Sequence, residues 1–329
     1  MHSEYLDRNL ALEAVRVTEM AALASSLHMG RGNEKQADQS AVNAMRKFLN
    51  SLMISGKVVI GEGERDKAPM LYIGEKVGLG GPKVDIALDP LEGTKITAHG
   101  GENALSVLAM GEEGSFLHSP DIYMHKIAYG KKFQDLEIDP EESADKIVRK
   151  FSDYSNIKIE NVVICTLDRP RHKDLISKIR STGARIKLIP DGDVSAVIAT
   201  SIDDSGIDMY MGIGGSPEGV LGAAALRCLG GKMYTKLIFD NEDIYERAQS
   251  MGIKNKNTIY TIDDLAKGDV MFSATGVTDG TMLKGVRYKN NIATTHSVVM
   301  RSKTNTVRYI YASHDLDKKN IFEINLGEQ

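Results

Sequence analysis

Val84-Asp85-Ile86-Ala87-Leu88-Asp89-Pro90-Leu91-Glu92-Gly93-Thr94 is the stretch that decides the fold around it. Its first six residues alternate with the period of two that is typical of a β-strand. Pro90 cannot donate to a sheet ladder and biases the preceding residue away from a helix, so we expect the strand to end at Asp89. Gly93 permits a tight turn, and Thr94 is predicted to cap the helix that follows.

The same stretch brings several oxygen atoms together. Asp89 and Glu92 supply carboxylates, and the turn exposes the carbonyl of Leu91. Hard cations such as Mg²⁺ prefer oxygen ligands, and the start of a helix nearby would favour a phosphate. The stretch predicts a metal-assisted phosphate site. Taken alone, it is also explained by a strand, a turn and two solvated acids.

Length, charge and cysteine content limit the class of protein. The chain has 329 residues, so we expect two domains, 1–155 and 156–329, or one large α/β unit. A net charge of -4 gives no basic field for nucleic acid. No apolar run reaches the roughly 18 to 20 residues of a membrane span, and residues 1–9 do not resemble a secretion signal. Cys165 and Cys228 have no paired spacing, which indicates reduced thiols. We expect a soluble, cytoplasmic protein that binds neither nucleic acid nor membrane.

The first half of the chain predicts a mixture of helices and strands. Apolar residues recur every three or four positions over 10–27 and 38–53, which predicts two amphipathic helices. Short strands are expected at 57–60, in the stretch quoted above, and at 104–110. This part of the chain is therefore mixed α and β, with acids at the ends of its strands.

The second half predicts regular alternation. Residues 136–150 are charged and contain a proline, so we expect an exposed connection there. Alternating strands and helices then imply a parallel sheet with right-handed crossovers. The strands are expected at 162–166, 186–189 and 207–213, and the helices at 171–181, 194–200 and 218–229. Beyond residue 270, alternating segments such as 292–300 and 306–311 predict antiparallel strands that complete this second sheet.

Polar residues follow each of the three expected strands of the second half. Parallel sheets bind ligands beyond the carboxyl ends of their strands, where 168–171, 191–193 and 212–218 fall here. Arg169 and Arg171 would grip a phosphate through forked donors. Surface charge and ordinary turns are the alternative explanation. The sequence has neither a nucleotide-binding P-loop nor a serine-hydrolase elbow.

Acids and histidines elsewhere also have structural alternatives. Glu62, Glu64 and Asp66 lie in a glycine-rich turn, which is typical either of a solvated loop or of a backbone that approaches a ligand closely. Asp38 is expected at the start of a helix, as an N-cap or as a ligand. Residues with no metal-ligand spacing, expected to be structural or on the surface, are His99, His118, His125 and His172.

Several long motifs, in the same order, resemble one family. The run from Asp89 to Thr94 is similar to the Asp-Pro-aliphatic-acid-Gly-Ser/Thr motif of the lithium-sensitive, metal-dependent sugar and inositol phosphatases. More narrowly, the chain resembles class II fructose-1,6-bisphosphatase of the bacterial GlpX type over nearly its whole length. The motifs that carry this resemblance are residues 37–38, 59–64, 68–78, 190–193, 212–219, 272–276 and 291–295.

The resemblance implies roles for individual residues. Asp38 and Glu62 would hold one divalent ion, Mg²⁺ or Mn²⁺. The second ion would be held by Asp89, Glu92 and Glu218, with the Leu91 carbonyl as a further ligand. Thr94 would position or activate the attacking water, with Glu64 and Asp66 close to the catalytic metals. The substrate-contacting positions would be Glu92, Gly93, Thr94, Tyr123, Arg169, Pro170, Arg171, Asp191, Gly192, Asp193 and Gly215.

The resemblance also implies a fold and an activity. The fold would be a layered α-β-α-β-α sandwich of two sheet-containing domains, of which 1–155 carries the metal-binding acids and 156–329 binds sugar phosphate. The site would lie between these halves, in a homodimer or homotetramer. The activity would be gluconeogenic hydrolysis of fructose 1,6-bisphosphate. The alternatives are a broader fructose and sedoheptulose bisphosphatase, or a catalytically silent sugar-phosphate-binding regulator.

One departure from the family pattern is visible near the first expected ligand. After Gly30-Arg31-Gly32 the family usually has Asp, often followed by Lys, whereas this chain has Asn33-Glu34-Lys35. The difference leaves Asp38 itself untouched.

Overall fold

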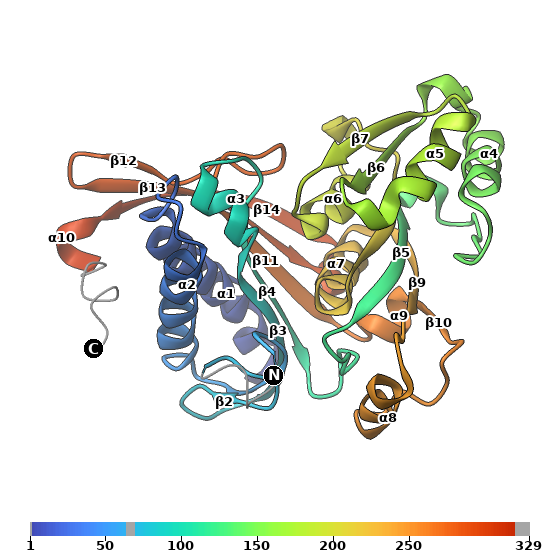
Figure 1. Ribbon diagram of the computed structural model, residues 1–329. Helices are drawn as coiled ribbons and strands as arrows, with labels where there is room; N and C mark the ends of the chain where they lie inside the picture. The colour runs from blue at the N-terminus through green and yellow to red at the C-terminus, as the bar shows by residue number, and fades with distance from the viewer. Residues whose placement is uncertain (1, 64–69, 320–329) are drawn as a thin grey trace. The chain divides into compact units, whose positions relative to one another are not determined.

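The structure is a computed structural model that describes the backbone of residues 2–63 and 70–319, and the side chains of residues 9–63 and 70–318. It divides into two compact units (Figure 1). Unit 1 comprises Met1–Phe116 and Gly268–Gln329, and unit 2 comprises Leu117–Lys267. Each unit contains a sheet with helices packed against it, so the predicted mixed α/β class with two sheet-containing parts is confirmed.

Unit 1 is built on an eight-stranded sheet. Its strands are β1 (Ser55–Ile60), β2 (Lys76–Val77), β3 (Lys83–Glu92), β4 (Leu105–Glu112), β11 (Val270–Gly276), β12 (Arg287–Lys289), β13 (Ile292–Arg301) and β14 (Thr306–Asp315). They lie in the order β12-β13-β11-β4-β3-β1-β2, and β14 pairs with β13. The pairing of β1 with β3 is parallel, whereas β3 with β4 and β4 with β11 are antiparallel.

The last four strands belong to this first sheet, so the prediction that they complete the second sheet is wrong. β11 pairs with β4 along its whole length, from Val270 opposite Gly111 to Gly276 opposite Leu105. All seven residues of β11 are buried, which makes it a central strand. The chain therefore returns to unit 1 at Gly268, and the two units are not the consecutive segments 1–155 and 156–329 expected from the sequence.

Two long helices cover one face of the first sheet (Figure 1). They are α1 (His2–Ser26) and α2 (Glu34–Leu49), which pack against each other, and α1 contacts β11 and β13. Their apolar faces form one core with the sheet, through fully buried residues such as Leu23, Met45 and Ile86. The short helices α3 (Thr94–His99) and α10 (Leu316–Lys319) follow β3 and β14.

Unit 2 contains a six-stranded mixed sheet. Its strands are β5 (Tyr123–Tyr129), β6 (Val163–Leu167), β7 (Arg185–Ile189), β8 (Met209–Gly215), β9 (Lys232–Leu237) and β10 (Ile259–Thr261), in the order β10-β9-β5-β8-β6-β7. The predicted strands β6, β7 and β8 are parallel, as expected. β5, which the sequence analysis did not predict, runs antiparallel between β8 and β9.

Helices lie on both faces of the second sheet. They are α4 (Ala144–Ser155), α5 (Lys173–Ser181), α6 (Asp193–Ala199), α7 (Ser216–Leu229), α8 (Glu242–Ser250) and α9 (Ile262–Leu265). α4 lies in the region predicted to be an exposed connection, and that prediction is wrong. Its apolar residues Ile147, Val148 and Phe151 are buried in the core of unit 2, because they recur at helical spacing among the charged residues.

Two further expectations concern the whole chain. Cys165 and Cys228 are both buried free thiols, in agreement with the prediction of reduced cysteines. Within residues 2–63 and 70–319, no helix combines the length and the apolar character that a membrane crossing requires.

Candidate functional site

The Asp89 motif forms a bulge in unit 1. β3 does not stop at Asp89 but continues through Pro90 to Glu92. Asp89 lies opposite Val107 of β4 and Glu92 opposite Leu105, with an irregular register between them. Pro90 has no N–H to donate, so a bulge is one of the few sites in a sheet that accommodates it. The expected strand end is thus corrected to a strand with a bulge.

Hydrogen bonding holds this bulge in place. The Leu91 N–H donates to Oδ1 of Asp89 over 3.0 Å, and Asp89 is half-buried. Glu92 is buried, at 5% exposure. A buried carboxylate is costly unless a cation or hydrogen-bond donors compensate its charge. The motif therefore presents two acids in a fixed backbone frame.

The residues that follow start a short helix. Gly93 is the N-cap of α3 and has φ +92°, a left-handed conformation that favours glycine. Thr94 is the first helical residue rather than the cap, so that prediction is wrong. The side chain that does hydrogen-bond near this terminus is Thr97, whose Oγ1 donates to the Gly93 carbonyl over 3.2 Å. The half-buried hydroxyl of Thr94 is thus not required for capping.

Asp38 lies within α2 and is not its cap. Asn33 is the N-cap, and its Oδ1 accepts the Gln36 N–H over 3.0 Å. The residue that departs from the family pattern therefore has a structural role, because Asn is among the best N-caps. Asp38 sits one helical turn further on, so the alternative that explained it as a cap is excluded.

Glu62 follows β1 in a turn whose backbone packs closely against Leu71. Its N–H donates to the Leu71 carbonyl over 3.0 Å, and a Cβ on Gly61 would overlap that same oxygen. Burial raises the pKa of Asp38. Burial, followed by the nearby charge of Asp38, raises the pKa of Glu62 to about 8. Two carboxylates that repel each other in a partly desolvated place fit a divalent cation, which would relieve both effects.

The remaining acids of the first half give less evidence for a metal site. Glu64 and Asp66 lie outside the described residues. Among the residues that are described, no group of three or more His, Cys, Asp or Glu side chains is arranged to hold a metal ion. Mg²⁺ is usually bound by one or two carboxylates, with waters and substrate phosphates as the other ligands. A pair such as Asp38 and Glu62 therefore fits such an ion, whereas a complete protein cage is not present in the described part.

The predicted substrate-binding residues of unit 2 gather at one edge of its sheet. β6, β7 and β8 are parallel, so their carboxyl ends at Leu167, Ile189 and Gly215 lie along the same edge. β5 is antiparallel to β8 and starts at this edge, with Tyr123 opposite Gly215. The structure therefore brings together the residues predicted from the three strand ends, together with Tyr123: Arg169, Pro170, Arg171, Asp191, Gly192, Asp193 and Gly215.

Contacts at this edge hold the arginines in place. Nε and one terminal nitrogen of Arg171 donate to the Ile213 carbonyl over 3.1 and 2.8 Å. Its guanidinium carbon lies 4.7 Å from the centre of the Tyr123 ring. Arg169 forms an ion pair with Asp191 at 3.5 Å. These contacts orient both side chains, which argues against freely moving surface charge.

His172 joins two strand ends at the same edge of the sheet. Its Nδ1 donates to the Leu167 carbonyl over 2.7 Å, and its Nε2 accepts the Ile213 N–H over 2.8 Å. Burial lowers the pKa of His172, and only the neutral ring can both donate and accept in this way. His172 therefore links the ends of β6 and β8, the structural role expected for it.

A buried cluster adjoins this edge. Lys126 Nζ lies 2.7 Å from Oδ2 of Asp193, which also accepts the Tyr210 hydroxyl over 3.3 Å. Glu218 lies on the first turn of α7, where the charges of Lys126 and Asp193 act on its carboxyl group. Its Oε2 has no hydrogen-bond partner among the described residues. Burial raises the pKa of Glu218 while Lys126 opposes that rise.

Sequence reasoning missed Lys126. The available signal was its position in the alternating segment 123–129, where it shares a sheet face with Met124 and Ala128. A lysine on the apolar face of a strand is expected only where an acid pairs with it.

Comparison with known proteins identifies the family. The sequence model described as "Bacterial fructose-1,6-bisphosphatase, glpX-encoded" matches residues 8–314. The chain belongs to this family. Three relatives, from Synechocystis sp., Microcystis aeruginosa and Trichodesmium erythraeum, are named D-fructose 1,6-bisphosphatase class 2/sedoheptulose 1,7-bisphosphatase. Each is 41% identical. The first two alignments cover 97% of this chain and 100% of the relative, and the third covers 94% and 97%.

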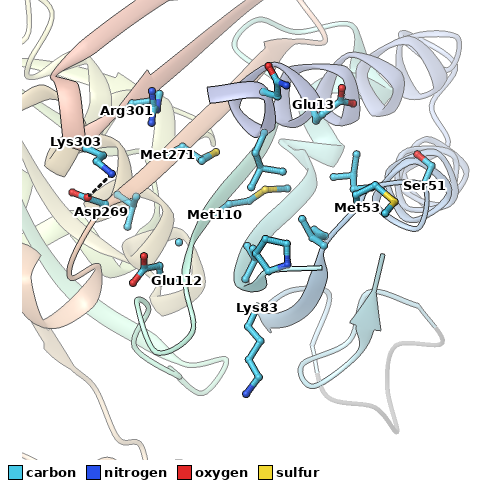
Figure 2. A pocket seen from close by; sticks show the side chains of 18 residues that line it. Glu13, Ser51, Met53, Lys83, Met110, Glu112, Asp269, Met271, Arg301 and Lys303 are labelled. Carbon is cyan, nitrogen blue, oxygen red and sulfur yellow. Dashed lines mark ion pairs between the residues drawn. The ribbon is translucent and has the colours of Figure 1, made fainter. Parts of the chain in front are cut away.

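The cavity shown in Figure 2 is separate from the acids of this glpX-family chain. It has a volume of about 440 Å³ and lies in unit 1. Met110 and Met271 line it, with Lys83 and Glu112 among its charged residues, and none of the predicted site residues does. Lys83 and Val84 line it at the start of β3, five to six residues before the bulge at Asp89, which is roughly 15 to 20 Å along the strand at about 3.3 Å per residue.

The carboxylate pair predicts how the stability of this family member depends on pH without metal. The Glu62 pKa is about 8 in the folded chain, against an ordinary value of 4.5. Between these values the folded state binds a proton that the unfolded state has lost. The free energy of unfolding should therefore fall as the pH rises from 4.5 to 8, by at most about 1.4 kcal/mol per pH unit, and by less because Glu62 is partly exposed.

Melting temperatures measured in chelator across this pH range test the prediction. Glu62→Gln should flatten the decline, because the amide does not titrate. Saturating Mg²⁺ or Mn²⁺ should flatten it in the wild type as well, because a metal ligand must be deprotonated. An equal slope in the wild type and in Glu62→Gln would show that Glu62 does not titrate in this range.

Proposed function

We propose that this chain uses divalent metal ions to hydrolyse the 1-phosphate of D-fructose 1,6-bisphosphate, releasing fructose 6-phosphate and phosphate. Its family, which is generally dependent on divalent metal, supports the reaction. The observation that carries the proposal is the pair of carboxyl groups Asp38 and Glu62, in the same unit as the Asp89 bulge: burial raises the pKa of both, and the charge of Asp38 raises that of Glu62 further. The reaction class is phosphoric monoester hydrolysis, with a place in gluconeogenesis.

The chemistry follows from the charge of the substrate. A phosphate monoester is dianionic near neutral pH and repels an attacking hydroxide, so its charge must be neutralised and its water oriented. We propose Mg²⁺ or Mn²⁺, two or more per site, which when bound supply charge neutralisation and a more acidic water. The residues proposed to hold them are Asp38, Glu62, Asp89, Glu92, Glu218 and the Leu91 carbonyl, with Glu64 and Asp66 nearby.

The chain's own residues orient the reactants. The Thr94 hydroxyl is proposed to hold the attacking water, and the amides around Gly93 to face the phosphate. Tyr123, Arg169 and Arg171 are proposed to bind the distal phosphate, because their forked donors and ring are already held in position. The positions proposed for the sugar hydroxyls and the remaining backbone contacts are Asp191, Gly192, Asp193, Gly215 and Pro170.

A second substrate is favoured by the names of the relatives. All three are named for sedoheptulose 1,7-bisphosphate as well as fructose 1,6-bisphosphate. We therefore keep a broader bisphosphatase as the alternative. A silent sugar-phosphate-binding regulator is less consistent with the chain, because all five side chains proposed as metal ligands are acids.

Phosphate release by purified protein separates these possibilities. The substrates are the two bisphosphates and fructose 6-phosphate, each with Mg²⁺, with Mn²⁺ and with chelator. We expect release from fructose 1,6-bisphosphate that chelator abolishes and either metal restores. Equal turnover of the two bisphosphates would establish the broader enzyme. Tight calorimetric binding of bisphosphate with no phosphate released under any metal would refute the hydrolase and support the regulator.

A cytoplasmic location and a homodimeric or homotetrameric state are also proposed. The family of metabolic phosphatases and the two buried free thiols support the location.

A further inference from the structure

Lys126 is a fully buried lysine in the middle of β5. Its side chain has no exposure, and that of Asp193 has 6%. Their charged atoms lie 2.7 Å apart, a short charge-assisted hydrogen bond. A lysine is almost never fully buried unless it is paired, and Asp193 is the acid that pairs with it here.

Glycines close the space around this pair. A Cβ on Gly214, at the end of β8, would overlap Oδ2 of Asp193 and lie 2.9 Å from Lys126 Nζ. A Cβ on Gly219, in the first turn of α7, would lie 3.4 Å from Lys126 Cε. Backbone therefore approaches the ion pair from two elements. The position of the Asp193 carboxylate is thus fixed by packing as well as by charge.

The pair leaves one carboxylate oxygen for a ligand. Lys126 and the Tyr210 hydroxyl both donate to Oδ2 of Asp193. Within the described part of the chain, no side-chain donor bonds Oδ1. Asp193 is the first residue of α6, next to Gly192 at the edge where the proposed substrate residues gather. An acid held through one oxygen can accept a hydroxyl at the other.

We propose that Lys126 is a positioning residue for substrate, which fixes Asp193 so that its free oxygen accepts a sugar hydroxyl. The inference rests on the proposed function, since it needs Asp193 to contact the sugar. Lys126 itself contacts no substrate and acts through Asp193. A core ion pair with no role in binding is the competing explanation.

A double-mutant cycle on product binding separates these explanations. The variants are Lys126→Met, Asp193→Asn and the double substitution, with fructose 6-phosphate titrated calorimetrically into metal-free protein. Each single variant should weaken binding by roughly tenfold or more, as for other residues that orient a ligand-binding group. The double variant should bind as Asp193→Asn does, because Lys126 acts only through Asp193.

Matched variants keep the cycle interpretable. Lys132 forms an exposed ion pair with Asp203 in the same unit, at 2.6 Å, and Lys132→Met should leave binding unchanged. If Lys126→Met does not fold, the double variant replaces it, because it leaves no carboxylate at position 193 without its lysine. Weaker binding by the double variant than by Asp193→Asn would overturn the inference.

Two other outcomes are decisive. If Lys126→Met melts at a lower temperature but binds fructose 6-phosphate within twofold of the wild type, its role is structural and the inference fails alone. If the wild type neither releases phosphate from a sugar bisphosphate nor binds fructose 6-phosphate, the proposed function fails and takes the inference with it.

Discussion

Thr94→Ala is expected to lower kcat by roughly two to four orders of magnitude while leaving the melting temperature unchanged. The loss follows if the Thr94 hydroxyl orients the attacking water, because an unoriented water reaches the phosphorus rarely. The fold should be insensitive, because Gly93 rather than Thr94 caps α3. Steady-state phosphate release and thermal unfolding of the same preparations provide the two measurements.

A second threonine in the same helix provides the matched control. Thr97 is fully buried, and its Oγ1 donates to the Gly93 carbonyl over 3.2 Å. Thr97→Val should lower stability by about 1 kcal/mol, the typical value of one hydrogen bond, and leave kcat within a few-fold. Thr94→Ser retains a hydroxyl and should recover much of the activity. Full turnover by Thr94→Ala would remove Thr94 from the mechanism.

Local pattern was sufficient to predict most of the elements. The helical spacing before residue 53 produced α1 and α2, and alternation produced β1, β3 and β4. In the second half, the three strand and helix pairs were predicted within a few residues because their apolar residues recur at strand or helix spacing. Such elements depend on periods of 2 and 3.6 residues, which the sequence displays directly.

Pairing between distant strands could not be predicted in the same way. β11 resembles any buried strand in sequence, and only its fit against β4 assigns it to the first sheet. The same limit applies to β5, whose segment combines Tyr123, His125 and Lys126 with apolar residues. Its lysine pairs with an aspartate 67 positions later. The pairing of such strands depends on residues far away in the sequence, which the local spacing of apolar residues does not indicate.

The candidate site was predicted from motifs, and its local geometry was predicted less well. The residues of the Asp89 motif and of the three strand ends do lie at strand ends and bulges. The cap expected at Thr94 and the alternative that made Asp38 a cap are both wrong, because the caps are Gly93, one residue earlier in the same motif, and Asn33. Helix ends shift by a few residues when a stronger capping side chain or a glycine is available nearby.

Asp89→Asn should lower kcat by roughly a thousandfold or more, even at saturating metal. A metal ion is worth several kcal/mol of transition-state stabilisation, and each 1.4 kcal/mol is a factor of about ten. The substitution tests the charge alone, because an asparagine Oδ1 can still accept the hydrogen bond that the Leu91 N–H donates over 3.0 Å in the wild type. Backbone geometry at the bulge is then retained, and only the negative charge is removed.

Asp85, four residues earlier on β3, provides a control, because its substitution removes a negative charge from the same strand but not from the proposed site. Asp85 is buried, whereas Asp89 is half-buried, and Oδ2 of Asp85 accepts the Gly114 N–H over 2.7 Å. Asp85→Asn likewise retains a backbone hydrogen bond and removes one charge, but it should leave kcat and calorimetric Mn²⁺ binding unchanged. Asp89→Asn should weaken both. If the two variants lose activity equally, the effect arises from the strand and Asp89 is not a ligand. A loss confined to Asp89→Asn, with Mn²⁺ affinity reduced in parallel, supports a cation at the bulge, because both substitutions remove one negative charge from β3.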